Sequence, residues 1–183
     1  MSRAKWAGLA CSLAAMPSIA DACTLPPPTV RLPAESEALF EARSKATLEA
    51  IEDEDRRSFQ VSLREKSLGS FIGIVERRDQ VTIEDGVGSM VSVRPIKKLT
   101  GTLPSGPFVL RDKRLTTCGT VGGGTATSGL VGEYVIVFRE MPFGSGREDF
   151  GIRAQEARDP FLLQALTDFA QEARDDAGPG PAS

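Results

Sequence analysis

Histidine is absent from the 183-residue chain, and aromatic side chains are scarce, with one tryptophan and one tyrosine. Without histidine the chain can build neither a histidine-dependent catalytic triad nor a Cys-His dyad, and it lacks the commonest metal ligand. Aromatic stacking of nucleic-acid bases or sugars would rest on Tyr134, because Trp6 lies in the signal segment described below. The sequence therefore predicts a protein that is not an enzyme and that uses no cofactor or metal.

Long apolar runs and basic patches are also missing. No apolar run has the length that a membrane-spanning helix needs. The formal net charge is −3, and a mildly acidic chain without a basic patch is a poor candidate for binding nucleic acid or an anionic membrane. We therefore expect no integral membrane span and no nucleic-acid partner.

Residues 1–22 have the three parts of a secretory signal peptide. Two basic residues precede the short apolar run Trp6–Met16, and small residues at Ala20 and Ala22 suit a signal peptidase. Cleavage would make Cys23 the first residue of the mature chain. We expect an extracytoplasmic protein, either periplasmic or secreted.

Cysteine is the next scarce residue, since cleavage leaves only Cys23 and Cys118. Two cysteines in an exported protein most simply form one disulfide. Closing a loop of about 95 residues stabilises a fold by about 4–5 kcal/mol in the chain-entropy model. The alternative is a lipid-anchored protein acylated at Cys23, although Asp21 fits a lipoprotein signal poorly and Cys118 would lose its partner.

The mature chain is expected to begin with a proline-rich leader, Cys23–Pro28, and a helical insert at about 33–67. One helix is predicted over Pro33–Glu54 and a second, short one over Ser58–Ser67. The apolar stripe is broad and weak, which favours a helix lying over a sheet. The charges of Glu52–Arg57 indicate a solvated helix end or loop, because consecutive helical residues point in different directions and make a poor metal site.

Short strands separated by turn signals are predicted from Leu68 onward. The expected strands are Phe71–Val75, Gln80–Ile83, Met90–Ile96, Pro107–Arg111, Tyr134–Phe138 and Phe150–Ala154. Gly73 indicates a bulge in the first, and Tyr134–Phe138 is apolar on both faces. Five or so such strands predict a mainly β fold, a small closed barrel of the OB type with flanking helices.

Two further segments have local signatures. Gly119–Thr125 is rich in glycine but lacks the lysine and the following helix of a phosphate loop, so we expect a flexible bend. Asp159 is expected to cap a C-terminal helix from Phe161 to about Ala173. Residues 175–183 are predicted to be a disordered tail.

Several of these segments resemble a known family. They are Phe71–Val75, Val91–Gly101, Phe108–Leu110, Cys118-Gly119 and Gly132–Phe138, whose order and spacing are similar to those of netrin-like domains. Tissue inhibitors of metalloproteinases (TIMPs) typify this family, which includes small exported bacterial proteins. The resemblance covers Cys23-Thr24 and roughly Leu68–Glu140. It implies an OB-type domain over 23–174 and pairing of Cys23 with Cys118.

The resemblance also implies a mechanism. In the animal inhibitors, the terminal cysteine places its amine and carbonyl on the protease zinc, and the next residue, Thr24 here, enters the specificity pocket. Leu25 stands where those inhibitors carry a second cysteine, and the insert at 33–67 is foreign to them. The sequence thus predicts a non-enzymatic binding protein of the bacterial cell envelope with a protein partner. A metalloprotease inhibitor acting through Cys23 and Thr24 is the alternative.

Overall fold

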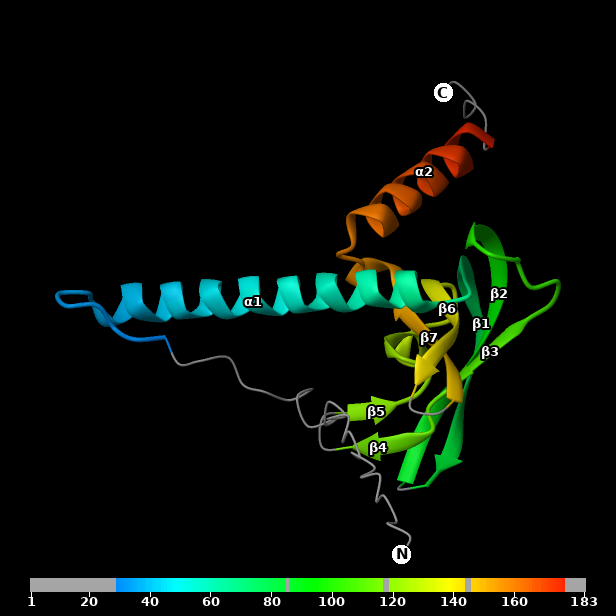
Figure 1. Ribbon diagram of the computed structural model, residues 1–183, viewed down its shortest axis with the longest axis horizontal. Helices are drawn as coiled ribbons and strands as arrows, with labels where there is room; N and C mark the ends of the chain where they lie inside the picture. Colours follow the sequence, from blue (N-terminus) through cyan, green and yellow to red (C-terminus); the bar gives the residue numbers. More distant parts are fainter. Residues whose placement is uncertain (1–28, 85, 117–118, 144–145, 177–183) are drawn as a thin grey trace, which may run out of the picture.

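The computed structural model of the chain describes residues 29–84, 86–116, 119–143 and 146–176. In Figure 1 a sheet forms the body of the molecule, and one long helix runs away from it. The elements are α1 (Glu37–Lys66), β1 (Gly69–Ile83), β2 (Gly86–Thr100), β3 (Phe108–Arg111), β4 (Arg114–Thr116), β5 (Gly119–Val121), η2 (Thr125–Ser128), β6 (Tyr134–Phe143), β7 (Gly146–Arg153), η3 (Ala154–Glu156) and α2 (Pro160–Asp176).

The body is a five-stranded antiparallel sheet in the order β3-β2-β1-β6-β7, which confirms the mainly β fold. β1 and β2 are each 15 residues long, and the register between them shifts beside Gly73. A Cβ atom at Gly73 would lie 2.4 Å from Cγ1 of Val93, so glycine allows the strands to come this close. The predicted irregularity at this position is confirmed.

The prediction of a closed barrel is wrong, because the edge strands β3 and β7 do not pair. β3 has only four residues, which is too short for an extended ladder with β7. The segment Gly122–Ser128 lies between the two edges instead. It is linked to β7 by an isolated bridge between Gly123 and Phe150, with a 2.9 Å hydrogen bond from Gly151 N to Gly123 O, and by a 3.4 Å hydrogen bond from Arg153 N to Oγ1 of Thr125.

The glycine-rich segment is a tightly packed turn rather than the flexible bend that was predicted. Gly122, Gly123 and Gly124 are buried and all have positive φ. A Cβ atom at Gly124 would lie 2.3 Å from the carbonyl oxygen of Gly151, so only glycine fits. The turn continues into the short 3-10 helix η2 and not into the helix that follows a phosphate loop.

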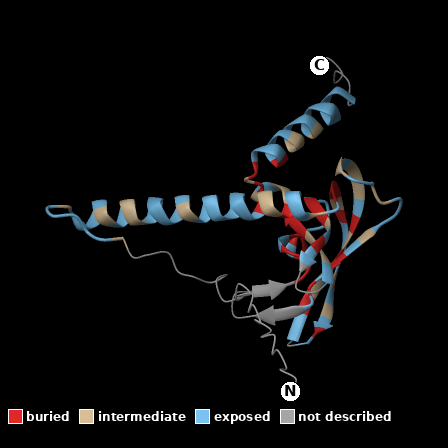
Figure 2. Cartoon of the chain, in the orientation of Figure 1, coloured by how far each residue is buried: buried red, intermediate tan, exposed pale blue. Residues whose placement is uncertain are grey.

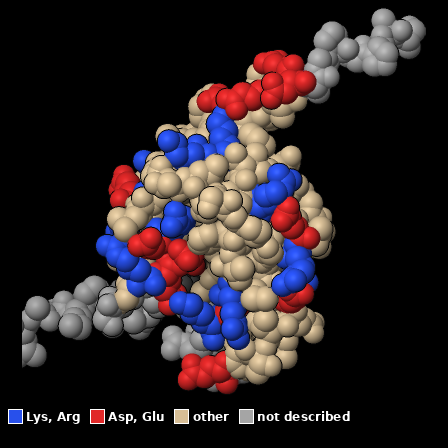
Figure 3. Space-filling model, turned by 90° about the vertical axis from the view of Figure 1, so that its right-hand side faces the viewer, with Lys and Arg blue, Asp and Glu red and all other residues tan. Residues whose placement is uncertain are grey.

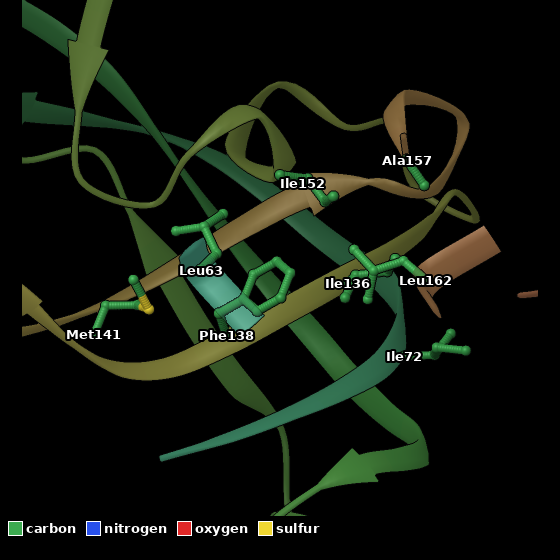
Figure 4. Close-up of a cluster of buried hydrophobic side chains, with 8 residues drawn as sticks. All are labelled: Leu63, Ile72, Ile136, Phe138, Met141, Ile152, Ala157 and Leu162. Atoms are coloured by element: carbon green, nitrogen blue, oxygen red, sulfur yellow. The ribbon is translucent and has the colours of Figure 1, made fainter. Parts of the chain in front are cut away.

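Two hydrophobic clusters lie on the two faces of the sheet, because successive residues of β1 and β6 point to opposite sides. The first contains Leu63, Ile72, Ile136, Phe138, Met141, Ile152, Ala157 and Leu162, with α1 and α2 each contributing one leucine (Figure 4). The second contains Phe71, Val75, Val91, Val93, Leu110, Ala126, Val135 and Val137. β6 is therefore apolar on both faces over 135–138, as predicted.

The helices differ from expectation mainly at α1, which is one continuous helix of 30 residues. The predicted interruption near Asp55 is wrong, since ion pairs between Arg56 and Glu52 and between Arg57 and Glu54 join successive turns. These charges are solvated, as predicted, but they lie within the helix.

α2 begins as expected at its N-terminal end. The Phe161 amide donates a 3.1 Å hydrogen bond to Oδ1 of Asp159, so Asp159 is its N-cap. The helix ends at Asp176, three residues after the predicted end at about Ala173, so residues 175 and 176 are helical and not part of the tail that was predicted to be disordered. Within the described part of the chain, no helix is long and apolar enough to cross a membrane.

Candidate interaction surface

Among the described residues, α1 is attached to the body through its C-terminal half. Gln60 and Leu63 are the buried residues of this helix, and Asp53 is the first of its side chains to bond with the body, through a 2.9 Å contact with Nε of Arg158. Figure 2 shows the rest of α1 largely exposed, while the buried residues gather in the sheet. We refer to residues 37–52 as the arm. The prediction that this helix lies over a sheet is wrong for the arm.

Gln60 holds the attached half of α1 against the chain before α2. Its Nε2 donates a 2.8 Å hydrogen bond to the carbonyl oxygen of Glu156. Its Oε1 accepts hydrogen bonds from the amides of Arg158 and Asp159, at 2.6 and 3.1 Å. One buried side chain thus pairs three backbone groups, which fixes the angle at which α1 leaves the body.

An ion pair reinforces this attachment. Nε of Arg64 lies 2.7 Å from Oδ2 of Asp159, whose side chain is only 2% exposed. The Arg64 guanidinium also lies over the Phe161 ring, 5.2 Å from its centroid. Asp159 therefore both caps α2 and joins it to α1.

A further group of contacts, one aromatic pair and one carboxylate, lies between α1 and β7 around a pocket of about 260 Å³. Phe59 packs edge-on against Phe150, with ring centroids 5.4 Å apart. Beside them, burial works to raise the pKa of Glu156, but hydrogen bonds from Thr125 and Arg153 hold that pKa below its usual value. Because both oxygens of this carboxylate are engaged within the protein, it serves as a structural link.

The arm is different in character, because it carries apolar side chains with nothing of the body over them. Leu39 is 63% exposed and Leu48 is 42% exposed. A wide-open surface patch of about 520 Å³, which we call the groove, lies along one side of α1. It is lined by Arg43, Ala46, Thr47, Ala50, Ile51, Glu54 and Asp55, so an apolar centre lies between charged ends.

The start of the arm is held by local electrostatics. Arg43 forms hydrogen bonds of 2.9 and 2.8 Å with the Glu35 carboxylate, and it donates another to the carbonyl oxygen of Val30. Bonding from Arg43, followed by that from the Leu32 amide, lowers the pKa of Glu35 to about 2. The segment before α1 is thereby tied to the beginning of the groove.

Charge on the body is mixed. On the face shown in Figure 3, Lys and Arg side chains are interspersed with Asp and Glu around a tan centre. Within the described residues, no group of three or more Asp, Glu, Cys or His could hold a metal ion. Exposed apolar side chains also occur on the body, for example Val87, Leu130 and Val131, so the arm differs from the rest of the described surface because it projects from the sheet as a single helix.

The predicted site residues Cys23, Thr24 and Cys118 all lie outside the described residues. Cys118 falls in the sequence between β4 and β5, where Thr116 pairs with Gly119. The disulfide, the zinc-directed N-terminus and the acylation of Cys23 consequently stay predictions.

Sequence reasoning missed the arm, and the weak apolar stripe of 33–54 was the one signal that could have revealed it. No family model matches the chain, and no curated protein or solved structure is found to be similar to it. The resemblance to netrin-like domains thus stays a prediction made from the residues. The arm is the surface on which a functional proposal can be built.

Proposed function

We propose that the chain is an exported, non-enzymatic binding protein of the bacterial cell envelope, which contacts a protein partner through its arm. The observation that carries this proposal is the exposure of Leu39 and Leu48 on a helix held only at its far end. Single exposed leucines are ordinary, and their spacing of nine residues puts these two on opposite sides of the helix. They carry weight because an apolar groove lies on the same projecting helix and includes Ile51, the neighbour of Leu48 one turn along.

The energetics of the arm favour a partner. Its 16 residues, 37–52, gain little from packing, and an isolated helix of that length is only marginally stable in water. Covering one leucine removes apolar surface from water and contributes about 1.5–3 kcal/mol when burial is complete. A partner lying along the arm would therefore stabilise the helix and gain affinity from the same contact.

The predicted disulfide between Cys23 and Cys118, which we call the N-terminal clamp, belongs to the same proposal. A disulfide between Cys23 and Cys118 would fix the proline-rich leader to the body, next to the β4–β5 hairpin. The TIMP-like family stays a proposal from the sequence resemblance, because the sheet is open between β3 and β7 and lacks the closed barrel that the resemblance implied. Inhibition of a metalloprotease and acylation at Cys23 are alternatives for the N-terminus alone.

Site-specific photo-crosslinking in intact cells tests the arm. A photoreactive residue at Leu48 should give an adduct with a protein, whereas one at Leu130, 68% exposed on the body, should not. The Leu48 adduct should disappear when Ile51, the neighbour of Leu48 one turn along the helix, is replaced by aspartate. Equal adducts from Leu48 and Leu130, or adducts indifferent to Ile51→Asp, would argue against the arm as the contact surface.

The intact mass of the exported protein tests the clamp. Residues 23–183 less two hydrogens is the expected mass, and added acyl mass would support the lipoprotein instead. Full alkylation of both cysteines without reduction would overturn the disulfide. Extending the mature N-terminus by one residue should leave arm binding intact but would abolish zinc-directed inhibition.

A further inference from the structure

The charges at the two ends of the groove of α1 are opposite, so the groove is complementary to a second copy of itself that runs in the opposite direction. Arg43 lies at one end of the groove and Glu54 at the other, with Thr47 and Ala50 between them. The two charged residues are separated by about 16 Å along a helix. We infer that this groove binds the same groove of a second copy of the chain, with the two helices antiparallel. The inference rests on the proposed function, since it names the partner of the arm.

A two-fold axis between Leu48 and Glu49 sets Arg43 of one copy opposite Glu54 of the other, at both ends of the contact. Arg43 is bonded to Glu35, and Glu54 lies 2.6 Å from Arg57 within its own chain. Each end of the helix pair then carries a row of four alternating charges, contributed by both copies. A parallel arrangement would instead place like charges together, which costs free energy.

The centre of the groove suits close helix packing. The same axis sets Thr47 opposite Ala50 of the second copy and Ala46 opposite Ile51. Alanine and threonine are small enough to bring two helix axes towards the short end of the usual 8–10 Å separation. The isoleucine supplies the apolar area that the two alanines lack.

Along the helix, the described part of the chain leaves a path open for the second copy. Glu54, Ser58 and Glu65 share one side of α1 through spacings of four and seven residues, and all three are exposed. This side therefore stays open past the point where Gln60 attaches the helix to the body. The arm of a second copy can follow it without displacing the contacts around Asp159.

The contact is small compared with the interface of an obligate dimer, so a reversible dimer is expected. Sedimentation of the mature, disulfide-intact protein should show a monomer–dimer equilibrium across the micromolar range. Ala50→Glu places a carboxylate in the centre of the groove and should weaken the dimer at least about tenfold. Ala42→Glu, at an exposed position of the same helix outside the groove, should leave it unchanged. Monomers at all concentrations, or equal effects of the two variants, would overturn the inference.

Charge exchange tests the orientation. Arg43→Glu alone and Glu54→Arg alone should each weaken self-association at least about tenfold, because each sets like charges opposite one another. An equimolar mixture of the two variants should regain it, since every end of the mixed dimer again holds opposite charges. Circular dichroism on each variant establishes that α1 is still helical. A mixture as weak as its separate components would contradict the antiparallel pairing.

A photoreactive residue at Thr47 separates this inference from the proposed function. Crosslinks to residues 46–51 of a second copy support the helix pair. Crosslinks to residues 23–28 of the same chain would show that the leader covers the groove, and would overturn it. A monomer whose Thr47 and Leu48 both crosslink another envelope protein would refute self-association and leave the proposed function standing. Crosslinks to no protein at either position would contradict both.

Discussion

The sheet and the arm are stabilised in opposite ways. The sheet buries side chains such as Phe71 and Phe138 completely, on its two faces. The arm buries none of its residues and relies on local contacts, including the Ser36 cap and the pair of Glu35 with Arg43. Tertiary packing thus specifies the body, whereas helix propensity and neighbouring charges specify the arm.

This difference explains how one chain can combine a fixed scaffold with an available surface. The network around Gln60 and Asp159 sets the direction of α1, so the arm projects in a defined way although the body does not cover it. Apolar residues on the arm contribute little to the stability of the monomer and remain available for another protein. Substitutions should therefore affect stability in the sheet and association in the arm.

The largest contrast is expected between core and arm. Phe138→Ala should lower the free energy of unfolding by about 3–5 kcal/mol, because it leaves a cavity in a completely buried cluster. Leu48→Ala should change it by no more than about 0.5 kcal/mol. Urea denaturation of the mature protein measures both. A comparable loss for the two variants would mean that the arm is packed against the body.

The junction between the two regions comes next. Asp159→Ala should cost about 3 kcal/mol, because it removes the cap of α2 and leaves Arg64 without its buried partner. Asp159→Asn keeps a good capping side chain and should cost less. If both substitutions were neutral by thermal unfolding, the ion pair would not hold α1 in place.

The glycine turn at the open edge of the sheet should show a smaller effect. Gly124→Ala should destabilise the fold by at least about 2 kcal/mol, since φ is +69° and the new methyl group would clash with Gly151. Gly106→Ala is the matched control, because a Cβ atom there meets nothing within 4 Å. Equal midpoints for the two variants in denaturation would contradict the tight turn.

The smallest effect is expected at the start of the arm and depends on pH. The pKa of Glu35 is lowered from 4.5 to about 2, so its contribution is fully present above pH 4.5 and is lost as the pH falls towards 2. Glu35→Gln should reduce protection of the first turns of α1 from hydrogen exchange at pH 6, and the difference from wild type should shrink in acid. A difference that grows on acidification would have the wrong sign.

Periodicity in the sequence was enough to predict several local elements of the body, although the two strands expected at Phe71–Val75 and Gln80–Ile83 are one strand, β1, and β4 and β5 were not predicted. The apolar run Tyr134–Phe138 became a strand buried on both faces, Gly73 marked an irregular register, and Asp159 capped α2. Each of these features depends on residues close together in the chain. They could be predicted because strand alternation, glycine sterics and capping are local effects.

Features that depend on distant contacts were not predicted. The prediction that the sheet closes into a barrel was wrong because β3 is short and the glycine turn occupies the space beside β7. No local sequence pattern indicates either feature. The continuity of α1 was missed because a cluster of charges was interpreted as a break, although their spacing allows pairing along one helix. The arm itself depends on the attachment at Gln60, a contact with residues almost one hundred positions away.

Hydrogen exchange of the mature protein, measured at low and at high concentration, tests the role of the arm most directly. We predict slow exchange in residues 71–75 and 135–138 at both concentrations. Residues 43–54 should exchange quickly in dilute solution and slowly in concentrated solution, with Ala50→Glu abolishing the change. An arm protected as strongly as the sheet in dilute solution would contradict the account.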